Sequence, residues 1–90
     1  MKTLQVGKRY VNNTINEIPL DYTSSIADNR MNEIGTLATG DVCVLLEIVQ
    51  LSCYSNSIDL KVLAPNGTIG WIWTSWSNAG SMLRLVENDQ

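Results

Sequence analysis

Residues 58–73, which read IDLKVLAPNGTIGWIW, contain the strongest local structural signal in the chain. Apolar and polar side chains alternate over most of 58–64, and 68–73 is rich in β-branched and aromatic residues, so both segments are predicted to be β-strands. Between them, Pro65 precedes Asn66-Gly67, a pair in which both residues readily adopt positive φ. The stretch is therefore predicted to be a β-hairpin with a two-residue turn.

The segment Asp41–Leu51, DVCVLLEIVQL, is predicted to be a long strand just upstream of this hairpin. Its odd and even positions are both largely apolar, which is typical of a strand that is sandwiched or belongs to a small closed barrel. A helix is disfavoured because Val and Ile are poor helix formers. We expect Val44 and Leu46 to lie in the core, together with Val62 from the hairpin.

The remaining segments complete a single all-β domain over residues 1–90. Short strands are predicted at Lys8–Val11 and Met82–Val86, a polar loop at 52–57 and a loose tail at 87–90. Residues 12–36 are rich in Asn, Ser, Thr and Asp and are predicted to be a long, mostly irregular loop of the kind that is often functional. About five strands and no clear helix predict a small antiparallel barrel.

The composition excludes several kinds of chemistry. The chain has no His, so it cannot form a Ser-His-Asp triad, a Cys-His dyad or a His-containing zinc motif by itself. Cys43 and Cys53 have no metal-ligand spacing and are expected to be free thiols, so no metal and no cofactor is predicted. A net charge of −3 argues against nucleic acid as a partner.

Two segments resemble the bacterial Src-homology-3-like (SH3-like, SH3b-type) family. Residues 32–47, NEIGTLATGDVCVLLE, resemble the family's I-G-x-L-x-x-G-D-x-V-x-V-L stretch, and residues 61–76, KVLAPNGTIGWIWTSW, resemble its hairpin with G-W-(I/V). The resemblance implies an SH3-like β-barrel of about five strands with a long loop after the first strand. It also implies that Gly70 allows a sharp bend with close packing, that Trp71 fills the core, and that 77–81 is an insertion.

The candidate ligand-binding residues are aromatic and acidic side chains expected to gather around one groove. Trp73 or Trp76 is expected to line it, and either Ile72 or Trp73 must face outward. Aromatic side chains of this kind are enriched at binding sites, and an acidic edge suits a Lys- or Arg-bearing partner. The full candidate set is Tyr22, Asp28, Glu33, Tyr54, Trp73 and Trp76.

These observations favour a non-enzymatic module that binds a protein or peptide through loops 20–36 and 52–57 and the Trp73–Trp76 turn. The resemblance implies a second hypothesis, recognition of cell-wall peptidoglycan. A third hypothesis is a small structural or assembly subunit, such as a phage protein, whose apolar patch is a homo-oligomer interface. Without a signal-peptide pattern or a membrane-spanning apolar run, the chain is expected to be cytoplasmic and to have no membrane partner.

Overall fold

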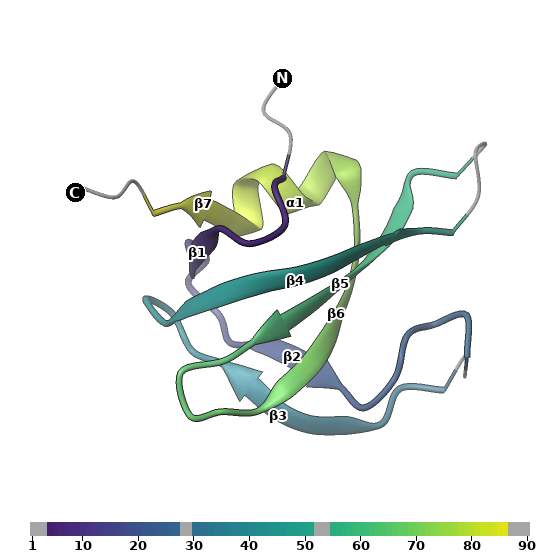
Figure 1. Ribbon diagram of the computed structural model, residues 1–90, viewed down its shortest axis with the longest axis horizontal. Coiled ribbons are helices and arrows are strands. Elements are labelled where there is room, and N and C mark those ends of the chain that lie inside the picture. Colours follow the sequence, from purple (N-terminus) through teal and green to yellow (C-terminus); the bar gives the residue numbers. More distant parts are fainter. Residues whose placement is uncertain (1–3, 28–29, 52–54, 87–90) are drawn as a thin grey trace.

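The computed structural model describes residues 4–27, 30–51 and 55–86 of the chain. Within these ranges the chain forms seven strands and one short helix (Figure 1). In chain order the elements are β1 (Arg9–Asn12), β2 (Ile18–Asp21), β3 (Glu33–Leu37), β4 (Val42–Gln50), β5 (Ser57–Leu63), β6 (Ile69–Ser75), α1 (Trp76–Met82) and β7 (Leu83–Leu85). The predicted tail at 87–90 lies outside the described residues.

All seven strands belong to one antiparallel sheet in the order β3-β2-β6-β5-β4-β1-β7. The sheet curls into a half-barrel, as Figure 1 shows, with β4, β5 and β6 crossing its middle. β1 lies between β4 and β7, so the first and last strands of the chain are neighbours. The prediction of an all-β chain is confirmed, but the number of strands is seven and not about five.

The two additional strands come from residues 12–36, where a mostly irregular loop was predicted. β2 pairs with β3 from Ile18↔Leu37 to Asp21↔Glu33, and β2 also contacts β6 through Asp21↔Trp71. The prediction was wrong because Pro19 and the surrounding polar residues hide a short alternation of buried and exposed side chains. Pairing with β3 and β6, rather than local propensity, makes this segment a strand.

The predicted hairpin is β5–β6, and its turn has three residues instead of two. The backbone N–H of Ala64 donates to the Thr68 carbonyl over 2.8 Å, and that of Gly67 donates to the Ala64 carbonyl over 3.0 Å. Gly67 has φ +93°, a conformation that favours glycine. Residues 65–67 therefore form a tight turn that ends on a left-handed glycine, a common three-residue hairpin loop.

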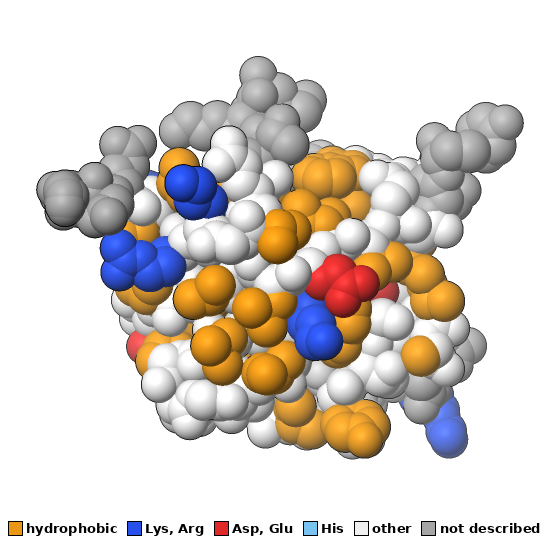
Figure 2. Space-filling model, in the orientation of Figure 1, with side chains coloured by type: hydrophobic (Ala, Val, Ile, Leu, Met, Phe, Trp, Pro, Cys, Tyr) orange, Lys and Arg blue, Asp and Glu red, His pale blue; other side chains and the backbone are white. Residues whose placement is uncertain are grey.

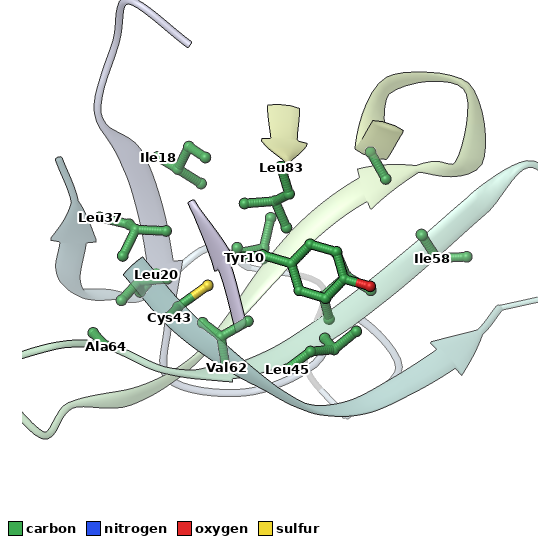
Figure 3. Close-up of a cluster of buried hydrophobic side chains, with 13 residues drawn as sticks. Tyr10, Ile18, Leu20, Leu37, Cys43, Leu45, Ile58, Val62, Ala64 and Leu83 are labelled. Carbon is green, nitrogen blue, oxygen red and sulfur yellow. The ribbon is translucent and has the colours of Figure 1, made fainter. Parts of the chain in front are cut away.

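The core lies inside the curl of the sheet, and its aromatic member is Tyr10 (Figure 3). Tyr10 is 3% exposed, and its hydroxyl accepts a hydrogen bond from the Gln5 N–H over 2.8 Å. Figure 3 shows the Tyr10 ring near Leu45 and Leu83. The core cluster of buried side chains consists of Tyr10, Ile18, Leu20, Leu37, Cys43, Leu45, Ile58, Leu60, Val62, Ala64, Ile72, Ala79 and Leu83.

Three residues expected in the core lie outside it. On β6 the inward positions are Gly70 and Ile72, so Trp71 faces outward and is only half-buried. On β4, Cys43 and Leu45 face inward, which leaves Val44 and Leu46 half-buried outside the core cluster. Both strands are apolar on their two faces, so the residue pattern does not distinguish the inner face from the outer. Val62 and Gly70 are buried, as expected.

A β-bulge interrupts the alternation of β4 between Leu45 and Glu47. Leu45 pairs with Val62, but Glu47 pairs with Lys61, so Leu46 is the extra residue. Beyond the bulge, Ile48 pairs with Leu60 and packs against the core. The bulge therefore moves the inward face from odd to even positions part-way along the strand.

Residues 77–81, interpreted as an insertion, belong to helix α1. The Ser75 side chain caps the helix by accepting a hydrogen bond from the Asn78 N–H, and Ala79 is buried against the core. A serine at this position satisfies an N–H that the first helical turn leaves without a partner. The prediction of no helix was wrong because a seven-residue helix is too short to show a clear periodicity.

Candidate functional site

The segment between β2 and β3 is closed at its base by Asp21, the last residue of β2. Asp21 is fully buried, and its Oδ2 accepts a hydrogen bond from the Thr23 N–H over 3.0 Å. Its Oδ1 accepts from the Asn32 N–H, while the Tyr22 N–H donates to the Asn32 carbonyl over 2.9 Å. One carboxylate thus joins the two ends of the segment, which is a common use of Asp at a turn.

Residues 22–27 form a loop that is held against the outer surface of β5 and β6. Asp59 of β5 is directly opposite Trp73 of β6. The Asp59 Oδ2 accepts hydrogen bonds from the Ser25 N–H over 2.8 Å and from the Ser25 hydroxyl over 2.9 Å. The Trp73 Nε1 donates to the Thr23 carbonyl over 2.9 Å. Loop 22–27 therefore covers Asp59, which is fully buried although it lies on the outer side of its strand.

Trp76 anchors the other candidate loop, which connects β4 to β5. Its Nε1 donates to the Gln50 Oε1 over 2.6 Å, and its backbone N–H donates to the Asn56 carbonyl over 2.9 Å. Asn56 in turn donates from Nδ2 to the Ser77 hydroxyl over 2.6 Å. Trp76 also packs against the core, so much of its ring serves the fold rather than the surface.

The expected groove residues are therefore divided between two loops. Tyr22 follows Asp21, Glu33 pairs with Asp21, and Trp73 donates to Thr23 of loop 22–27. Trp76, the first residue of α1, is instead bonded to the loop between β4 and β5. The described parts of both loops lie at the same side of the molecule (Figure 1). Two more of the expected residues, Asp28 and Tyr54, lie outside the described residues.

Some of the candidate groups are exposed to a ligand, and others already form hydrogen bonds within the chain. Tyr22 is 68% exposed and Glu33 is exposed. The indole N–H groups of Trp73 and Trp76 already donate within the chain, which leaves parts of their ring surfaces for contact. The choice between Ile72 and Trp73 is also settled, because Ile72 is buried and Trp73 faces outward.

Thr23, Ser25 and Asp59 were missed as contributors to this site. Asp59 alternates with apolar neighbours in its strand, which indicates a solvent-facing carboxylate, and nothing local shows that a distant loop covers it. Its Oδ1 has no hydrogen-bond partner among the described residues. The local sequence of β5, SIDLKVL, carries no signal that Asp59 is buried.

The outer face of β5 and β6 also brings a cation to an aromatic ring. The Lys61 Nζ lies 5.9 Å from the centroid of the Trp71 ring, within the range of a cation–π contact. Lys61 and Trp71 are direct cross-strand partners. Trp71, which was expected to fill the core, therefore contacts a lysine on the outer side of the sheet.

The described residues contain no group of three or more Cys, Asp or Glu side chains arranged to hold a metal ion. Cys43 is a buried free thiol, and desolvation by burial raises its pKa from 9.0 to about 11, against the lowering effect of backbone hydrogen bonds at Cys43 and Tyr10. Such a thiol is a poor nucleophile near neutral pH. Cys53 lies outside the described residues.

No protein-family model, no curated protein and no solved structure matches this chain. Over residues 4–27, 30–51 and 55–86, no helix is long and apolar enough to cross a membrane.

Proposed function

We propose that the chain is an SH3-like, non-enzymatic binding module that recognises a protein or peptide partner. The strand order supports the SH3-like assignment. β6-β5-β4-β1-β7 is a run of five antiparallel strands in which the last strand pairs with the first. β2 and β3 are then the two arms of the long segment after the first strand, and α1 is a short element before the last strand.

The proposed binding surface is where loop 22–27 meets Trp73, and one observation carries the proposal. Trp73 holds the loop through the Thr23 carbonyl, and this arrangement leaves Tyr22 68% exposed at the base of the loop. An exposed aromatic on a loop fixed to a rigid sheet loses little entropy on binding, so it is a suitable anchor for a partner.

The charge near Tyr22 indicates the chemistry of the partner. Asp21 and Asp59 are buried and hydrogen-bonded to the loop, so they are not available on the surface. Glu33, which is directly opposite Asp21 in the β2–β3 pair, is exposed. An exposed tyrosine beside an exposed carboxylate suits a peptide that carries an apolar residue next to a Lys or Arg.

Selection of a phage-displayed library of random peptides on the purified protein tests this proposal. Enriched peptides should carry a basic residue beside an apolar one. Tyr22→Ala and Glu33→Gln should each weaken the binding of a synthetic copy of such a peptide about tenfold, measured by fluorescence anisotropy. Ile15→Ala is the matched control, because Ile15 is 92% exposed in the β1–β2 connection. Failure to enrich any peptide, or unchanged binding by Tyr22→Ala, would refute the proposal.

A further inference from the structure

The outer face of β4, β5 and β6 is more apolar than a solvent-facing sheet surface requires. Val44, Leu63 and Ile69 are aligned across the three strands, and all three are at least partly exposed, with Ile69 at 49%. An antiparallel sheet with one solvated face usually carries polar residues there. Figure 2 shows hydrophobic side chains gathered over this face of the molecule, with one basic and one acidic side chain among them.

The next row across the same strands carries the charges. Glu47 on β4 is directly opposite Lys61 on β5, and Lys61 is opposite Trp71 on β6. The Lys61 ammonium group is directed toward Trp71, whose ring centroid is 5.9 Å away. We refer to Val44, Leu63, Ile69, Glu47, Lys61 and Trp71 as the outer face. These six residues include one acid and one base, and the exposed Arg9 of β1 continues the Val44 row beyond them.

Loop 22–27 limits the outer face on one side. The following row is Val49–Asp59–Trp73, and its Asp59 and Trp73 are hydrogen-bonded to Ser25 and Thr23 of that loop. The proposed peptide surface at Tyr22 and the outer face are therefore different parts of the molecule. The hydrogen bonds from Asp21, Asp59 and Trp73 to loop 22–27 involve neither Glu47 nor Lys61.

The strand register makes the outer face complementary to itself. We propose that it binds a second copy of this chain, around a two-fold axis that runs parallel to the strands between β4 and β5. This axis places β4 of one copy over β5 of the other. Val44 then faces Leu63 of the partner subunit, and Glu47 faces Lys61 of the partner subunit, each contact occurring twice. Sheets pack face to face about 10 Å apart, which side chains of this size fill.

The Glu47–Lys61 pair favours this axis over a two-fold axis perpendicular to the strands. A two-fold axis perpendicular to the strands at the same row would place Glu47 opposite Glu47 and Lys61 opposite Lys61, and like charges facing each other oppose association. The Glu47–Lys61 pair, one acid and one base as direct neighbours, is matched by the same pair in a second copy. A strongly acidic or basic partner would leave one of the two charges repelled.

Sedimentation velocity over a hundredfold range of protein concentration tests the proposal. The wild-type protein should shift reversibly from monomer to dimer. Glu47→Lys and Lys61→Glu should each raise the dimer dissociation constant about tenfold or more, because each creates two like-charge contacts. An equimolar mixture of the two variants should form a heterodimer. In it, each of the two lysines of one variant faces a glutamate of the other, so both contacts are attractive. Formation of this heterodimer also shows that both variants are folded.

Leu63→Ser should weaken the dimer, because Leu63 is placed opposite Val44 across the two-fold axis. Ile15→Ser, which removes an exposed apolar side chain elsewhere, should not. A wild-type protein that stays monomeric throughout, a dimer that neither charge reversal weakens, or a mixture that forms no heterodimer would overturn the proposal. None of these results depends on peptide binding at Tyr22, so this proposal and the proposed function can fail separately.

Discussion

Gly70 of β6 lies directly against Leu20 of β2, and a Cβ built on Gly70 would be 2.8 Å from the Leu20 Cβ. The same added atom would lie 3.3 Å from the Asp21 carbonyl oxygen, so backbone as well as side chain blocks it. Only glycine allows β2 to approach β6 this closely. This approach brings Asp21 opposite Trp71 and thereby positions the base of loop 22–27.

We expect Gly70→Ala to lower the free energy of unfolding by about 1–3 kcal/mol, because β2 must move away from β6. Urea denaturation followed by tryptophan fluorescence measures this change. Gly35→Ala is the matched control: its Cβ would meet the Thr68 Cγ2 at 3.7 Å, an ordinary contact. The control should stay within about 0.5 kcal/mol of wild type. A Gly70→Ala protein as stable as the control would contradict the close approach of the two strands.

Asn12 at the end of β1 joins three segments from a fully enclosed position. It is 1% exposed, and its Nδ2 donates to the carbonyls of Leu37 over 2.8 Å and Asn16 over 3.0 Å. Its Oδ1 accepts from the Thr14 N–H over 2.9 Å. Asn12→Ala would remove the side-chain donor of the buried Leu37 carbonyl, which costs about 1–3 kcal/mol in a chemical or thermal denaturation experiment.

The neighbouring Asn13 provides the comparison for Asn12, because it is exposed. Asn13→Ala should change the free energy of unfolding by less than about 0.5 kcal/mol. Equal effects of the two substitutions would mean that the buried hydrogen bonds of Asn12 contribute nothing to stability.

Ser25 determines how firmly loop 22–27 stays on the sheet. Its hydroxyl donates to the buried Asp59 carboxylate over 2.9 Å, and hydrogen bonds to charged groups are stronger than neutral ones. In Ser25→Ala we expect amide hydrogen exchange in residues 23–25 to become about tenfold faster, because the loop opens more often. In Ser24→Ala, which keeps both Ser25 contacts with Asp59, exchange in this loop should remain close to wild type. Unchanged exchange in Ser25→Ala would show that the loop is held by other contacts.

The buried Cys43 thiol predicts a loss of stability in alkali. Burial raises its pKa to about 11 in the folded chain, above its ordinary value of 9.0. Between these two pH values the unfolded chain has lost the thiol proton and the folded chain still binds it, so stability decreases as pH rises. The two-unit shift corresponds to a decrease of about 2–3 kcal/mol between pH 9 and the folded pKa.

Urea midpoints measured at several pH values from 8 to 11 test this dependence. Other groups also titrate in alkali, so the relevant quantity is the difference between the wild-type protein and Cys43→Ala. This difference should diminish as pH rises through the window. If the stability of the two proteins changes with pH in parallel, the raised pKa of Cys43 is contradicted.

Parts of the fold and of the candidate site were predictable from the residue pattern. β4, β5 and β6 were predicted nearly in full, because each shows a sustained apolar run next to turn residues. Tyr22 and Trp73 were named as site residues because aromatics near loops stand out in a chain with few of them. The pairing of β2 with β3, and the covering of Asp59 by Ser25, could not be predicted because they join residues far apart in the chain.

The sequence by itself determined three things about this protein: the three central strands β4, β5 and β6, the position of the turn between β5 and β6, and the absence of histidine. These properties depend on side-chain volume, backbone freedom and residue type at adjacent positions. Only the tertiary structure decided that Ile72 faces the core and Trp71 faces outward. Both faces of β6 are apolar, so burial alone does not distinguish them, and the contact of Gly70 with Leu20 of a distant strand selects the inner one.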